Sequence, residues 1–131
     1  MANRSEVRAE TGEVPYRTVL TNGRSTFIAD ERKDLGGADE GATPNELMCM
    51  SLAACTSITL KMYAARKNWD TGTITVEVAM HHHEGETIFM RKISLAVDQT
   101  AEINERILAV ANKCPIHKTL SAANKIESNI V

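Results

Sequence analysis

Aromatic side chains are scarce in this sequence: they make up 4% of the 131 residues, although 43% of the residues are hydrophobic. An interior with few large rings has to be filled by aliphatic side chains and by the six methionines, whose flexible thioethers adapt to irregular gaps. The length is that of one ordinary domain. We therefore expect residues 1–131 to form a single domain.

Clustered positive charge is also missing, because the net charge is −2 and no run of lysines and arginines occurs. This argues against nucleic acid and anionic membranes as main partners. Residues 1–6 lack the apolar core of a signal peptide, and no apolar run approaches the roughly 20 residues that span a bilayer. We expect a cytoplasmic protein with no membrane partner, in which the three cysteines are thiols unless redox chemistry is their function.

The first 40 residues have the pattern of β structure. Residues 17–21 and 25–29 flank Asn22-Gly23, a pair that favours a two-residue hairpin turn because both positions tolerate a positive φ. The glycine-rich segment 35–41 lacks the Gly-Lys-Ser/Thr ending of a phosphate-binding loop, and its acidic residues would repel phosphate. We expect this segment to be a flexible connector.

A long helix is predicted from Thr43 to about Arg66. Thr43 is a suitable N-cap, Pro44 suits the first helical position, and Glu46 completes a capping box. Apolar residues cover every direction of this helix, and a helix of this kind is normally buried on all sides. Because so small a chain has few other elements to cover it, a second subunit is an expected source of the extra cover.

A β-hairpin is predicted next. Residues 74–80 and 89–97 carry alternating apolar and polar side chains, which is the period of a half-buried strand. Glu84-Gly85 lies between them and is the expected turn.

The last third of the chain predicts two helical segments and a strand. The first helix runs from about residue 101 to 113, with Thr100 as its cap. Pro115 ends this helix, because the residue before a proline disfavours helical geometry. A short helical turn at 119–123 and a strand at 126–131 complete a compact α+β fold.

Some histidines look like fragments of metal sites. Adjacent strand residues point to opposite faces, so His81, His82 and His83 cannot converge on one ion. Cys114 and His117 resemble half of a zinc site, but no second pair of this kind exists. We expect a solvated hairpin end and neither metal nor other cofactor. A serine hydrolase is also unsupported, because no Gly-x-Ser-x-Gly elbow occurs.

Two of the cysteines lie at marked positions. Cys55 falls inside the predicted long helix, and Cys114 directly precedes Pro115. Cys49 lies about 9 Å and about 120° from Cys55 along one helix, too far for a disulfide, so we interpret it as a core residue. An unpaired cysteine is usually structural, and the alternative for Cys55 and Cys114 is a redox pair.

A reactive cysteine needs thiolate character, and the start of the predicted helix lies too far from Cys55 for the helix dipole to act. A nearby cation is therefore required. Arg24 is the first candidate, and the alternative for it is a plain surface arginine. Arg91, which shares the core-facing parity of its strand, is the second, although we interpret it as a surface arginine. Glu46 is a further candidate site residue besides its capping role.

Two segments together resemble the osmotically inducible protein C and organic hydroperoxide resistance (OsmC/Ohr) family. They are residues 41–47 (GATPNEL) with 52–55 (LAAC), and residues 111–117 (ANKCPIH). The resemblance extends over nearly the whole chain.

This resemblance implies an OsmC-like intertwined homodimer, in which long central helices pack between curved antiparallel sheets and the active sites lie at the subunit interface. It also implies a thiol peroxidase without a prosthetic group. Cys55 resembles the peroxide-attacking cysteine, Cys114 the resolving cysteine and Arg24 the activating arginine. The characterised peroxidases have a glutamate ten residues before the attacking cysteine; this chain has Asn45 there and Glu46 next, which implies a divergent subfamily.

The resulting hypothesis is a peroxidase that reduces organic hydroperoxides to alcohols through a Cys55 sulfenate and a Cys55–Cys114 disulfide, with a cellular dithiol as reductant. Apolar residues around Cys55, such as Leu52 and Ile58, predict a preference for organic over hydrogen peroxide. The alternative is a non-enzymatic redox sensor or stress-related binding protein that uses the same dithiol. The natural peroxide and the reductant stay open.

Overall fold

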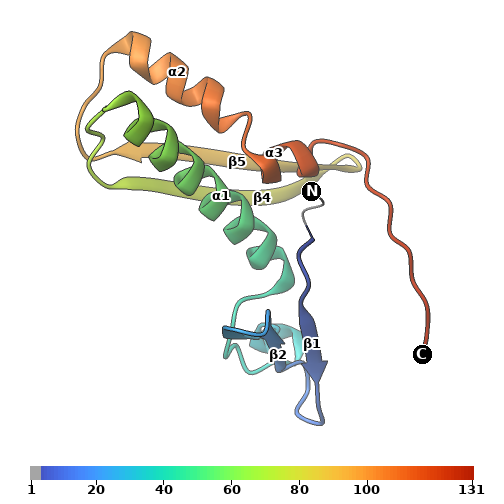
Figure 1. Ribbon diagram of the computed structural model, residues 1–131. Helices are drawn as coiled ribbons and strands as arrows, with labels where there is room; N and C mark the ends of the chain where they lie inside the picture. Colours follow the sequence, from blue (N-terminus) through green and yellow to red (C-terminus); the bar gives the residue numbers. More distant parts are fainter. Residues whose placement is uncertain (1–3) are drawn as a thin grey trace. The chain divides into compact units, whose positions relative to one another are not determined.

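A computed structural model describes residues 4–131 and divides the chain into two compact units, Met1–Met48 and Cys49–Val131. The first unit contains a three-stranded antiparallel sheet, and the second contains a two-stranded antiparallel hairpin with helices beside it (Figure 1). This combination of helices with antiparallel sheets confirms the α+β class. The expectation of a single domain stays a prediction.

The sheet of the first unit has the strand order β1–β2–β3. β1 comprises Arg8–Thr11, β2 comprises Thr18–Thr21 and β3 comprises Thr26–Ala29. β1 is missing from the sequence-based prediction because all four of its residues are exposed, so no apolar side chains mark a buried face.

The hairpin predicted around Asn22-Gly23 is confirmed, but its loop is longer than two residues. The strand pairing leaves residues 22–25 outside the ladder. The carboxamide oxygen of Asn22 accepts the backbone N–H groups of Arg24 and Ser25 at 2.9 and 2.8 Å, and Gly23 has a φ of 92°. An asparagine that bonds the backbone in this way closes a wider turn than the residue pair alone indicates.

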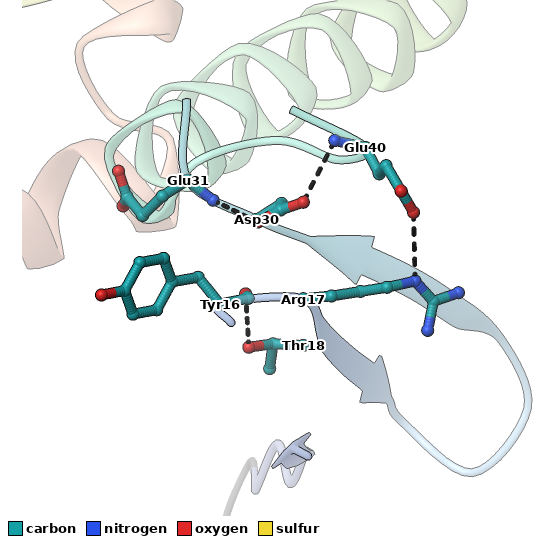
Figure 2. A network of polar contacts seen from close by, with 6 residues as sticks. All are labelled: Tyr16, Arg17, Thr18, Asp30, Glu31 and Glu40. Atoms are coloured by element: carbon teal, nitrogen blue, oxygen red, sulfur yellow. Dashed lines mark hydrogen bonds and ion pairs between the residues drawn. The ribbon is translucent and has the colours of Figure 1, made fainter. Parts of the chain in front are cut away.

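The segment between β3 and the long helix is folded around the buried side chain of Asp30 (Figure 2). Its carboxylate accepts the backbone N–H of Glu31 at 2.7 Å and that of Glu40 at 3.2 Å, and its own N–H donates to the carbonyl of Ala42 at 3.0 Å. Glu40 also forms an ion pair with Arg17 at 3.3 Å. These bonds close residues 31–41 into a compact loop.

Two glycines make this loop possible. A Cβ atom at Gly37 or Gly41 would collide with backbone carbonyl groups, so only glycine permits the close approach. The loop also contains a short 3-10 helix, η1, Lys33–Leu35. Residues 35–41 lie in the connector between β3 and α1, as predicted, and the glycines let its backbone bond to itself; the predicted flexibility stays a prediction.

The long helix α1 spans Pro44–Lys67 and begins with the predicted capping box. The N–H of Thr43 donates to Glu46 Oε1 at 2.8 Å, and the N–H of Glu46 donates to Thr43 Oγ1 at 3.2 Å. The backbone hydrogen bond from Thr43 is the main cause that lowers the pKa of the Glu46 carboxyl. The predicted start of the helix is confirmed, and its end lies one residue beyond the prediction.

Only one stripe of α1 is buried within the single chain. The stripe repeats every four residues and consists of Leu52, Thr56, Leu60 and Ala64. Large apolar side chains on other directions of the helix are exposed, among them Met50, Ile58 and Met62. The chain by itself therefore does not bury α1 on all sides.

The hairpin of the second unit consists of β4, Ile74–His83, and β5, Glu86–Leu95. The predicted turn is confirmed, because Glu84 and Gly85 both have positive φ angles, 49° and 77°. Two successive positive angles match the twist of the paired strands. β4 is longer than predicted because its pairing continues through the histidine triplet.

The helix α2, Ala101–Ala111, lies beside α1 along this hairpin (Figure 1). As predicted, the hydroxyl of Thr100 caps it by accepting the N–H of Ile103 at 3.2 Å. Buried side chains form the centre of the core between the helices and the strands, and partly buried side chains pack around them. Its centre is Leu60, Ile107 and Ala111, and around them pack Trp69, Ile74, Ile93, Leu95, Ile103 and Val110.

By length and composition alone, α1 could cross a membrane: its best window has a mean hydropathy of 1.3, and 22% of that window is buried. This corrects the expectation that no apolar run approaches 20 residues. Helices in protein interiors have the same composition, and Leu60 of α1 belongs to the core.

The C-terminal part of the chain differs from the prediction. α2 ends at Ala111, and a further helix, α3, spans Pro115–Leu120 instead of 119–123. The strand predicted at 126–131 is absent, because no strand among residues 4–131 pairs with it. Its apolar side chains are exposed, including Ile126 and Ile130.

Candidate redox site

Cys114 is fully buried at the junction between α2 and α3. It has the extended conformation expected before a proline, with φ −62° and ψ 144°, and it is the N-cap of α3. Its Sγ accepts the backbone N–H of His117 at 3.3 Å. The local sequence Cys-Pro-x-His thus holds the sulfur at the start of a short helix.

Cys55 lies in the middle of α1, is half-buried, and its Sγ is 4.0 Å from the hydroxyl of Thr59. Cys55 is also one of the groups that lower the pKa of Cys114, so the two thiols lie close enough to interact. All three cysteines are free thiols. Cys49 is half-buried in the single chain, and its interpretation as a core residue stays a prediction.

A hydroxyl and a guanidinium lie beside the two thiols. Thr56 Oγ1 is 3.8 Å from Cys114 Sγ and 2.7 Å from the carbonyl oxygen of Leu52. The Nη1 group of Arg91 donates to the same hydroxyl oxygen at 3.1 Å. Thr56 is fully buried, so each of these contacts is shielded from water.

The second terminal nitrogen of Arg91 binds the segment that carries Cys114. Nη2 donates to Asn112 Oδ1 at 2.9 Å and to His117 Nδ1 at 3.1 Å. Because a guanidinium only donates, His117 Nδ1 is the acceptor in this contact. The interpretation of Arg91 as a surface arginine is therefore wrong: it is half-buried and ties β5 to α1, to residue 112 and to α3.

The pKa of the Cys114 thiol lies below its usual range. Burial is the largest single effect and raises this pKa, but the other contacts together outweigh it. They are the N–H of His117, the nearby groups of Cys55 and Thr56, and the positive charge of Arg91. Cys114 therefore has more thiolate character than a buried cysteine normally has.

The other two predicted site residues belong to the first unit. Arg24 lies in the exposed loop between β2 and β3, and Glu46 is the exposed third residue of α1, where it caps the helix. The capping role of Glu46 is confirmed. The catalytic roles of Arg24 and Glu46 stay predictions.

Sequence reasoning missed Thr56, Asn112 and His117 as members of this cluster. One signal was available for Thr56: it is the polar residue in an otherwise apolar stripe at intervals of four. No comparable signal marks Asn112, because its contact with Arg91 joins residues that are far apart in the sequence.

A pocket of about 440 Å³ opens beside the cluster in the second unit. Arg91 and His117 line one part of it. Apolar side chains line another part: Leu52, Ile88, Phe89 and Leu120. Such a pocket suits a small ligand with a polar and an apolar end.

No group of three or more His, Cys, Asp or Glu side chains within residues 4–131 is arranged to hold a metal ion. His82 Nδ1 instead contacts the Thr87 hydroxyl across the hairpin at 3.0 Å. The cluster contains thiols, a hydroxyl and a cation, and a cation near a thiol favours its reactive thiolate form.

The sequence of the chain matches one protein family. The family profile described as OsmC-like protein matches residues 36–129, which include both cysteines of the pair. No functionally curated protein sequence matches the chain.

Solved structures resemble the chain over most of its length. A Psychrobacter arcticus protein named for osmotic stress induction and detoxification response is 19% identical, with a TM-score of 0.77 over 91% of this chain and 90% of that one. An OsmC-like protein from Mycoplasma pneumoniae is 20% identical, with a TM-score of 0.73 over 92% and 89%. An organic hydroperoxide resistance protein from Elizabethkingia anophelis is 21% identical, with a TM-score of 0.68 over 91% and 89%. At these identities the similarity shows a shared fold.

Proposed function

Because the chain belongs to the OsmC-like protein family, we propose that it is a thiol peroxidase that reduces organic hydroperoxides to alcohols. The observation that carries the proposal is the cluster in which Cys114 lies beside the Thr56 hydroxyl and the Arg91 guanidinium, with Cys55 near enough to affect the pKa of Cys114. Several proteins of the same fold are named organic hydroperoxide resistance proteins, which supports the substrate class.

The proposed reaction has two chemical steps before reduction. The Cys55 thiolate attacks the distal oxygen of the hydroperoxide, the O–O bond breaks, and the alkoxide leaves and takes up a proton to give the alcohol. The Cys114 thiolate then attacks the Cys55 sulfenic acid, an S–S bond forms, and the displaced hydroxide takes up a proton to give water. A cellular dithiol reduces the disulfide and is itself oxidised.

Access to solvent supports this division of roles between the two thiols. Cys55 is half-buried, whereas Cys114 is fully buried behind Thr56 and His117. A peroxide therefore reaches Cys55 first, and Cys114 is positioned to react with a neighbouring sulfur. Arg24 and Glu46 are proposed to assist Cys55 on the basis of the family resemblance alone.

Organic hydroperoxides are expected to be better substrates than hydrogen peroxide. The pocket beside the site has an apolar part formed by Leu52, Ile88, Phe89 and Leu120. Burial of an alkyl chain contributes about 0.8 kcal/mol per CH₂, so a few methylenes give one to two decades of preference, roughly. The measurement is kcat/KM for hydrogen peroxide, tert-butyl hydroperoxide and cumene hydroperoxide with an excess of a dithiol reductant.

A variant of the pocket lining tests whether apolar contacts with the substrate, and not the reactivity of the thiols, cause the preference. Phe89→Ala removes apolar lining, and we expect it to lower kcat/KM for cumene hydroperoxide more than that for hydrogen peroxide. Equal values for all three peroxides in the unaltered protein would remove the argument for an apolar substrate. Oxidation of the thiols without turnover would favour the alternative, a redox sensor or stress-related binding protein.

We also propose that the protein is a homodimer. The exposed apolar side chains of α1 and of the C-terminal segment 126–131 need a cover that the single chain does not supply. Segment 126–131 in addition has backbone groups that could pair with a strand of a second copy. Light scattering at micromolar concentration is expected to give the mass of two chains, and a uniform monomer would contradict the proposal.

The cytoplasm is the proposed location. The proposed cycle begins with Cys55 and Cys114 as thiols, and thiols persist in a reducing compartment. A dithiol reductant is also available in such a compartment, as the last step of the proposed cycle requires.

A further inference from the structure

Arg91 carries a charge that its own hydrogen-bond partners do not neutralise. The guanidinium donates to three groups that carry no negative charge: the hydroxyl of Thr56, the amide of Asn112 and the imidazole of His117. Within residues 4–131, no carboxylate lies within ion-pair distance of it. Since an arginine keeps its proton in proteins, the positive charge is available to any anion that forms nearby.

The hydroxyl of Thr56 connects this charge to Cys114. Its oxygen accepts from Arg91, so its single proton goes to one of two acceptors, the Leu52 carbonyl oxygen at 2.7 Å or Cys114 Sγ at 3.8 Å. When Cys114 is protonated, the hydroxyl bonds to Leu52. When Cys114 is a thiolate, the proton turns toward the sulfur and forms a charge-assisted bond.

From this geometry we infer that Arg91 and Thr56 are positioning residues that hold Cys114 in its thiolate form. The guanidinium acts through the Thr56 hydroxyl, and the N–H of His117 completes the set of donors around the sulfur. Cys55, by contrast, contacts the hydroxyl of Thr59, which is not among the groups that Arg91 binds.

The charged and titratable groups around Cys114 come from three elements. Cys55 faces it from α1, Arg91 from β5 and His117 from α3, while residue 112 after α2 contributes a neutral amide. The cation is thus the one permanent charge in this set. The lowered pKa of Cys114 agrees with the geometry, since burial alone would raise it.

In the proposed function, on which this part of the inference rests, an ionised Cys114 accelerates two steps. As a thiolate it attacks the Cys55 sulfenic acid without first losing a proton. During reduction, an incoming dithiol attacks the Cys55 sulfur and Cys114 leaves, because the thiol of lower pKa is the better leaving group. Arg91 and Thr56 therefore promote both steps by keeping Cys114 ionised.

The ionisation of Cys114 can be measured without any peroxide. In a Cys49→Ser/Cys55→Ser background, Cys114 is the only thiol of the chain, and serine at position 55 keeps a hydrogen-bonding group beside it. The ultraviolet absorbance of the thiolate is followed against pH. We expect a midpoint below the value of about 8.5 for a free cysteine, and a rise of about one unit in Thr56→Val and in Arg91→Met.

Three matched variants in the same background serve as controls. Thr56→Ser keeps the hydroxyl and is expected to keep the midpoint, and Arg91→Lys keeps a charge and is expected to shift it less than Arg91→Met. Lys92→Met removes a positive charge from the exposed, opposite face of β5 and is expected to cause no shift. If Thr56→Val does not fold, Arg91→Met alone tests the inference, because replacement of the half-buried Arg91 disturbs the core less.

A kinetic measurement on the chain with all its cysteines tests the consequence. After one equivalent of an alkyl hydroperoxide, disulfide formation is expected to slow about threefold per unit of rise in the pKa, because higher nucleophilicity offsets part of the lost thiolate. An unchanged midpoint in both Thr56→Val and Arg91→Met would overturn the inference, as would an equal shift in Lys92→Met. Absence of peroxide reduction would contradict the proposed function only, since the titration uses no peroxide.

Discussion

Replacement of Cys55 by serine is expected to abolish turnover of organic hydroperoxides. A serine hydroxyl is not deprotonated at neutral pH and cannot form a sulfenic acid, so the first oxygen transfer has no acceptor. The remaining thiols do not replace Cys55: Cys114 is fully buried, and Cys49 precedes Cys55 by six positions on α1 and points in another direction. The measurement is the steady-state loss of cumene hydroperoxide with a dithiol reductant.

Cys49→Ser is the matched control for this substitution. It removes a half-buried thiol from the same helix, and we expect it to retain turnover while the free energy of unfolding falls by about 1 kcal/mol. The assignment of the attacking cysteine would be wrong if Cys49→Ser were inactive and Cys55→Ser active. Labelling of the sulfenic acid with a dimedone reagent, followed by mass spectrometry of the peptides, identifies the attacking residue directly.

Replacement of Cys114 by serine is expected to stop the reaction after the first oxidation. The variant should release one equivalent of alcohol per chain and then stall, because the Cys55 sulfenic acid has no neighbouring thiolate with which to form a disulfide. With excess peroxide, Cys55 is expected to be oxidised further to the sulfinic acid. Rapid-mixing measurement of alcohol release, together with the mass of the intact protein, distinguishes a single event from continued turnover.

Comparison of the Cys55→Ser and Cys114→Ser proteins tests the proposed roles of the two thiols, Cys55 as the attacking and Cys114 as the resolving cysteine. A Cys114→Ser protein that turns over at the rate of the unaltered protein would exclude Cys114 as the resolving cysteine. A Cys114→Ser protein without even one oxidation, together with an active Cys55→Ser protein, would reverse the two roles. Neither result would change the inference that Arg91 and Thr56 ionise Cys114, because that inference is tested by titration.

Local features of the chain were predictable because their causes lie within a few residues. The capping box at Thr43 and Glu46, the turn at Glu84-Gly85 and the extended conformation before Pro115 all follow from short-range hydrogen bonds and backbone sterics. The α+β class follows from the alternation of such elements along the chain.

Predictions failed where the cause lies in a distant segment. β1 has no apolar pattern, and its strand exists because β2 supplies the backbone partners. The closed form of the loop at 31–41 was not predicted, because the carboxylate of Asp30 reaches across ten positions to Glu40. The strand expected at 126–131 is absent because an apolar pattern alone supplies no pairing partner, and residues 4–131 offer none to this segment.

The candidate site combines both kinds of information. The sequence by itself singled out Cys55 and Cys114, since an unusual residue type at a helix centre and before a proline is visible in one dimension. Only the tertiary structure decided which groups surround the sulfurs, because Arg91, Thr56 and His117 come from three elements whose meeting depends on how the helices pack on the hairpin. A charge acts through space, and its distance to a thiol is set by packing and not by position along the chain.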